Sequence, residues 1–172
     1  DESISSICDF PRNPNGVILE PMNNSLYVVT WGNNAPIYEV DFTTEEFYTV
    51  TTTDLNNLDG ISVDECGNFL ISAWSTNSIH RFSNDFSENE IIVDGLSYPA
   101  DIIYNQLNSV IAIPNSGSNT VEFITYSPFN EPLGLSWWCT DGLQLNNQIE
   151  EIFIVKTIDL LGRENNSKGF II

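Results

Sequence analysis

The chain has 172 residues, enough for one domain or for one domain with a small appendage. Its 24 acidic and five basic residues give a net charge of −19, which opposes binding to the phosphate backbone of nucleic acids and to anionic membranes. The hydrophobic content of 41% predicts a packed core, yet no apolar run is long enough for a transmembrane segment. The negative charge is compatible with binding of cations and cationic ligands.

The acidic charge is concentrated in the first part of the chain. Residues 1–124 carry 18 acidic and two basic side chains, whereas residues 125–172 carry six acidic and three basic ones. This difference in surface character indicates two structural parts, which the sequence patterns below also separate.

One pattern occurs three times in the first part. The copies are NGVILEPMNNSLYVVTW (15–31), DGISVDECGNFLISAW (59–74) and ADIIYNQLNSVIAIP (100–114). Gly16, Gly60 and Asp101 occupy equivalent positions, at offsets of 44 and 41 residues. A repeat of this length, without helical periodicity, is typical of the blades of a β-propeller.

Each copy predicts short strands separated by polar turns. In the second copy the expected strands are 61–63, 69–72, 79–82 and 90–93, with a polar turn at 64–68. The apolar strands 26–29 and 109–112 of the other copies correspond to 69–72, and the alternating strands 37–40 and 120–123 correspond to 79–82. The pattern therefore predicts about three four-stranded blades.

The second copy, DGISVDECGNFLISAWSTNSIHRF (59–82), resembles an NHL repeat. This resemblance implies an all-β fold, a partial β-propeller in residues 1–124, with repeats near 14–57, 58–98 and 99–124. Closed propellers have 4–8 blades. We therefore expect either a fragment of a longer chain or self-association through blade faces that carry Val29, Ile71 and Ile111.

The second part has a different pattern. Residues 125–149 are rich in Pro, Gly and Asn, which predicts a linker. The segment EEIFIVKTIDLLGRENNSKGFII (150–172) resembles part of the immunoglobulin-like C-terminal sorting domain of bacterial type IX secretion; an ordinary hairpin is the alternative. The resemblance implies recognition by that secretion machinery and a secreted or cell-surface location. We expect residues 150–172 to pack little against the repeats.

Two residues at the starts of the repeats are candidate metal ligands. Asn15 and Asp59 each precede a glycine, in turns that resemble the metal-binding blade starts of gluconolactonase-like propellers. That resemblance implies a site for Ca²⁺ or another divalent cation, with Asp59 also acting as a catalytic base. Asp101 is displaced by one residue and is expected to face the other way on a strand. Tight turns that favour Asn and Asp are the structural alternative.

Two further features leave alternatives open. Trp31 and Trp74 occupy equivalent repeat positions and either line a ligand-binding surface or pack between blades. The three cysteines, Cys8, Cys66 and Cys139, form one disulfide and a free thiol or remain reduced.

The sequence lacks a complete catalytic set, because His80 is the only histidine and no nucleophile or metalloprotease motif occurs. We therefore expect an exported binding or scaffold module without catalysis of its own, for a small molecule, a glycan or a protein. The alternative is a divalent-metal-dependent lactone hydrolase.

Overall fold

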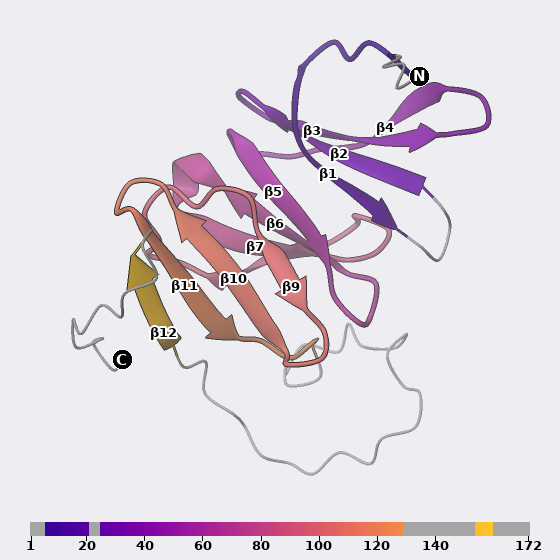
Figure 1. Cartoon of the computed structure of the whole chain (residues 1–172). Coiled ribbons are helices and arrows are strands. Elements are labelled where there is room, and N and C mark those ends of the chain that lie inside the picture. Colours follow the sequence, from indigo (N-terminus) through magenta and orange to yellow (C-terminus); the bar gives the residue numbers. More distant parts are fainter. Residues whose placement is uncertain (1–5, 21–24, 129–153, 160–172) are drawn as a thin grey trace, which may run out of the picture.

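The computed structural model describes residues 6–20, 25–128 and 154–159, which form three four-stranded antiparallel sheets (Figure 1). The first sheet contains β1 (Asn13–Glu20), β2 (Ser25–Trp31), β3 (Pro36–Asp41) and β4 (Glu46–Thr52). The second contains β5 (Leu58–Val63), β6 (Phe69–Ala73), β7 (Ser78–Phe82) and β8 (Asn89–Val93). The third contains β9 (Ile103–Asn105), β10 (Val110–Asn115), β11 (Thr120–Thr125) and β12 (Ile154–Asp159).

The sheets stand side by side as blades, and β1, β5 and β9 run in the same direction along one side of them (Figure 1). This arrangement confirms the all-β fold and the three four-stranded blades. No helix among the described residues is long and apolar enough to cross a membrane; the 3-10 turn η1 (Trp74–Thr76) has three residues.

The fourth strand of the third blade comes from the second part of the chain. Strand β12 pairs antiparallel with β11, so that Thr120 lies opposite Asp159 and Ile124 opposite Ile154. This pairing differs from the expectation that residues 150–172 pack little against the repeats. The third repeat supplies only three strands, and the backbone groups at the free edge of β11 are satisfied by a strand from further along the chain. The remainder of the linker and tail lies outside the described residues, so the sorting-domain resemblance stays a prediction.

Two apolar clusters fill the spaces between blades. Side chains alternate along each strand, so that Val29 faces the second blade while Val28 faces outward. The first cluster includes Val29, Ile37, Leu58, Phe69 and Ile71; the second includes Leu70, Ile79, Ile102, Ile111 and Ile113. The expectation that Val29, Ile71 and Ile111 lie on exposed faces is therefore wrong, because all three are fully buried between blades.

The two outer faces of the blade stack differ. On the first blade, Cys8 and Phe10 cover Val28 and Tyr38, and the Phe10 and Tyr38 rings stack with centroids 5.2 Å apart. On the third blade, apolar side chains surround a hollow of about 650 Å³; they include Ile103, Leu107, Val110, Ala112 and Phe123. Ile103 is 65% exposed and Leu107 95%. Self-association stays a prediction, and this open face is where it would occur.

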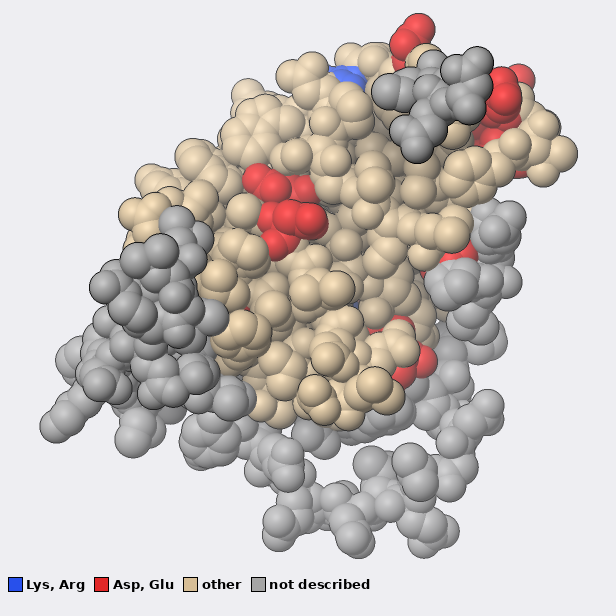
Figure 2. Space-filling view, viewed as in Figure 1, with Lys and Arg blue, Asp and Glu red and all other residues tan. Residues whose placement is uncertain are grey.

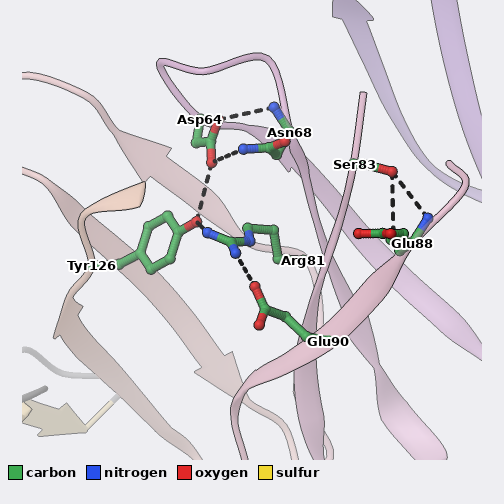
Figure 3. A network of polar contacts seen from close by, with 7 residues as sticks. All are labelled: Asp64, Asn68, Arg81, Ser83, Glu88, Glu90 and Tyr126. Atoms are coloured by element: carbon green, nitrogen blue, oxygen red, sulfur yellow. Dashed lines mark hydrogen bonds and ion pairs between the residues drawn. The ribbon is translucent and has the colours of Figure 1, made fainter. Parts of the chain in front are cut away.

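A buried polar network ties the second blade to the third (Figure 3). Arg81 on β7 forms an ion pair with Glu90 on β8 and donates a hydrogen bond of 3.4 Å to the Tyr126 hydroxyl. That hydroxyl donates to Asp64 at 3.1 Å, and Asp64 accepts the backbone N–H of Asn68 at 2.9 Å. Burial, and then the negative charge of Asp64, raise the pKa of Tyr126. Each charge in this network thus has a partner, which buried charges require.

The starts of the first strands of the blades touch one another at glycines. A side-chain carbon at Gly16 would lie 3.0 Å from the Cα of Gly60, and one at Gly60 would lie 2.7 Å from the Cα of Asp101. Neither glycine has a positive φ, so space rather than backbone conformation requires glycine here. The repeated glycine therefore sets how closely neighbouring blades approach.

We predict that Gly60→Ala lowers the free energy of unfolding by about 3 kcal/mol, because the added carbon meets backbone atoms that cannot move aside. Urea unfolding of the full chain measures this loss. Gly95→Ala is the control: Gly95 has φ +71° and open space around it, so the cost is only the backbone strain of about 1 kcal/mol. Equal losses for the two variants would contradict the close packing of the blade starts.

Candidate functional site

Asn15, Asp59 and Asp101 lie together where the blade starts meet. Asn15 donates a hydrogen bond of 3.3 Å from its side-chain nitrogen to the Leu58 carbonyl and also hydrogen-bonds the Asp59 side chain. The carboxylate of Asp101 acts on Asp59 through its negative charge. Acidic side chains gather over β5 and the segment that leads into β9 (Figure 2). The structure thus brings Asn15 and Asp59 together, as the sequence predicts.

The expectation that Asp101 belongs to a strand, where neighbouring side chains point to opposite faces, is wrong. Strand β9 begins only at Ile103, and Asp101 lies in the bend that precedes it, beside Gly60. We call Asp59 and Asp101 the acidic pair.

Half-burial raises the pKa of Asp59, the charge of Asp101 raises it further, and the hydrogen bond from Asn15 opposes both effects. No basic side chain of the described residues acts on Asp59. Arg81 belongs to the buried network, and Arg12 lies against Gly32. Neither of these two arginines therefore neutralises the negative charge of the acidic pair.

Three aromatic side chains form a continuous row at the same end of the blades. The ring centroids of Trp31 and Trp74 are 5.4 Å apart, and those of Trp74 and Tyr98 are 4.3 Å apart in a stacked arrangement. The Trp74 indole donates a hydrogen bond of 3.3 Å to the Ser116 hydroxyl. Trp31 and Trp74 are half-buried and Tyr98 is exposed. We call these three residues the aromatic row; it both packs across the blades and presents a surface.

The aromatic row adjoins the acidic pair. Trp31 lies opposite Asn13 at the start of β1, and Leu58, the residue before Asp59, pairs with Ala73, the residue before Trp74. The backbone N–H of Trp74 also donates to the Asn57 carbonyl at 3.0 Å. Both features therefore belong to one end of the blade stack.

Sequence comparison among the repeats found Trp31 and Trp74 but missed Tyr98. The third repeat has Pro114 at the equivalent position, and Tyr98 lies in the connection that precedes that repeat. Its left-handed backbone, with φ 53°, and the hydrogen bond of its N–H to Asn77 hold it at the end of the row. A positional comparison of repeats cannot find a residue contributed by a connection.

The acidic pair does not make a complete cation site. Ca²⁺ takes six to eight oxygen ligands, and the pair supplies two carboxylates while Asn15 uses its side-chain nitrogen as a donor to Leu58. The described residues contain no group of three or more His, Cys, Asp or Glu side chains placed to hold a metal. The Asn15 and Asp59 metal site therefore stays a prediction.

His80 and two of the cysteines are not part of this site. His80 is buried on β7, its Nε2 lies 3.0 Å from the Ser78 hydroxyl, and burial lowers its pKa. Cys66 is disulfide-bonded and Cys8 is a half-buried free thiol, which corresponds to the first of the two cysteine arrangements expected from the sequence.

Comparison with known proteins supports the fold but gives no family. No protein-family model matches the chain, and no curated protein matches it. Solved structures do match, among them a chain in the crystal structure of a nidogen/laminin complex, with a TM-score of 0.60 and 17% identity. The match covers 68% of this chain and 45% of that one, so this chain spans less than half of the structure that it matches. The similarity shows a partial β-propeller fold.

We predict that Asp59→Asn raises the melting temperature at pH 7 by about 1–2 °C. Because the folded state raises the pKa of Asp59, ionisation of this carboxyl favours the unfolded state as the pH rises above the ordinary value of 3.8. The gain over the wild type should therefore vanish near pH 3, where the carboxyl is protonated in both states. Asp94→Asn, which also removes one negative charge but at an exposed position, is the charge-matched control. Calorimetry at both pH values measures the difference, and an equal gain at pH 3 and pH 7 would contradict it.

Proposed function

We propose that the chain is an exported protein-binding module without catalysis of its own, and that the aromatic row is its contact surface. The observation that carries this proposal is the continuous, partly exposed row of Trp31, Trp74 and Tyr98 across neighbouring blades. Trp and Tyr dominate the binding energy of protein interfaces, because they bury large areas with few rotatable bonds. The chain of similar fold named above comes from a structure of a complex between two proteins, which supports the same use of the fold.

The ring geometry favours a protein over a glycan or a small molecule. The Tyr98 ring stacks on the Trp74 ring with their centroids 4.3 Å apart, and the plane of the Trp31 ring is tilted by 56° from that of Trp74. The three rings therefore differ in orientation and do not form one flat platform on which a sugar could stack. An irregular apolar surface of this kind suits the side chains of a protein segment.

Three observations support export to the cell surface or the medium. Cys66 is disulfide-bonded, and disulfides persist in oxidising environments outside the cytosol. Residues 150–172 resemble a type IX sorting segment, whose partner would be the secretion machinery. The net charge of −19 suits an exposed, soluble surface.

A binding selection tests this proposal. A displayed library of peptides and small proteins is selected on the purified chain, and the binders are measured again on the double variant Trp31→Ala/Trp74→Ala. We expect these variants to weaken the selected binders by about 30-fold or more, as for hot-spot residues. The control is Tyr48→Ala/Leu107→Ala, which alters exposed apolar side chains elsewhere and should leave binding intact. Binders that keep their affinity for the tryptophan variant, or a chain that binds glycans instead, would overturn the proposal.

A divalent-metal-dependent lactone hydrolase is the second candidate. The nearness of Asp101 to Asp59 and Asn15 favours it, because it adds a second carboxylate to the expected metal ligands. A metal that binds only the folded state raises the melting temperature. If the chain is a protein-binding module without a metal site, we expect Ca²⁺, Mn²⁺ and Zn²⁺ at millimolar concentration to change the melting temperature by less than about 1 °C. A larger rise that Asp59→Ala abolishes and Asp94→Ala preserves would favour the hydrolase.

A further inference from the structure

The acidic pair and the aromatic row are independent features that share one end of the blades. The row consists of side chains from the end of β2, from the start of η1 directly after β6, and from the connection before β9. The pair lies at the starts of the first strands of the second and third blades, and backbone contact at Gly60 holds it together. A partner that covers the row from this end also reaches the pair.

The chemistry of the pair defines what it can accept. Two carboxylates lie close enough to repel each other, one of them half-buried, and neither Arg12 nor Arg81 pairs with them. Asn15 donates to Asp59 and so supports its charged form. A cationic group that arrives from outside removes the repulsion and supplies several hydrogen-bond donors at once.

The adjoining row decides which kind of cation fits. A free metal ion gains nothing from Trp31 and Trp74, and the pair lacks the oxygen ligands that it needs. A protein segment gains from both, because its apolar side chains cover the row while a basic side chain reaches the pair. The stem of a Lys or Arg side chain is itself apolar and packs well beside aromatic rings.

We propose that the partner is a protein segment with a Lys or Arg side chain, flanked by apolar residues, whose charged group binds between Asp59 and Asp101 while its neighbours cover the aromatic row. This inference rests on the proposed function and deepens it, since it specifies a positively charged group of the partner and the place at which that group binds. The guanidinium group of Arg fits best, because its fork of donors can bridge two carboxylates.

Two matched peptides test the inference. The probes are acetylated and amidated Gly-Leu-Arg-Leu-Gly and the same peptide with citrulline, which has nearly the shape of arginine without its charge. Each is titrated into the ¹⁵N-labelled full chain, and the amide signals of Asp59 and Asp101 and the indole signals of Trp31 and Trp74 are followed. We expect the arginine peptide to shift all four signals and to bind about tenfold more tightly than the citrulline peptide.

Two charge-matched double variants identify the site. Asp59→Asn/Asp101→Asn should abolish the preference for arginine while the indole signals still respond to both peptides. Glu88→Gln/Asp94→Asn removes two exposed negative charges elsewhere on the second blade and should keep the preference. The preference should also shrink between about 0.05 and 0.5 M salt, as screening requires.

The outcomes separate this inference from the proposed function. Equal binding of the two peptides, with shifts at the indoles only, overturns the inference and leaves the aromatic row as a binding surface. An arginine preference that survives in Asp59→Asn/Asp101→Asn also overturns it. If neither peptide shifts any of the four signals, the inference falls, while the selected binders still decide the proposed function.

Discussion

The fold and the candidate site depend on one constraint, the close approach of the blade starts at Gly16 and Gly60. Because glycine has no side chain, the backbone of each blade start rests directly on the next. This contact brings Asn15, Asp59 and Asp101 into one place although they are far apart in the sequence. In the third repeat Asp101 stands where the other repeats have glycine.

The blade interfaces combine apolar packing with a few buried charges. The apolar clusters supply most of the stabilisation, because burial of apolar surface is roughly proportional to its area. Asp64, Arg81, Glu90 and Tyr126 add little net energy, since desolvation offsets much of the attraction between buried charges. A shift of the third blade along the second would, however, break both hydrogen bonds of the buried Tyr126 hydroxyl, those to Arg81 and to Asp64. The network therefore specifies how the two blades are aligned.

The sequence predicted the features that repeat and missed those that do not. The three copies gave the blade number, the apolar strands and the adjacency of Asn15 and Asp59, because a repeated pattern reflects a repeated environment. Tyr98 and Asp101 lie in connections, where strand alternation does not apply. The sequence also could not show that Val29, Ile71 and Ile111 face inward, because alternation does not say which face meets a neighbour. Strand β12 joins its blade from beyond the linker, and no local signal marks such a pairing.

The acidic pair lowers the stability of the folded state, and this loss of stability supports a role in binding. The carboxylates repel each other and burial disfavours the charge of Asp59, whereas an amide at either position would keep hydrogen bonding without the repulsion. Residues that lower stability are expected at functional sites, where ligand binding offsets the lost stability. Here a bound cationic group offsets the repulsion within the acidic pair. The long-range electric field of a chain with a net charge of −19 also attracts such a group before contact. The aromatic row then holds the apolar part of the partner. Electrostatic attraction thus governs the rate of encounter and its salt dependence, while the buried aromatic area governs how long the complex lasts.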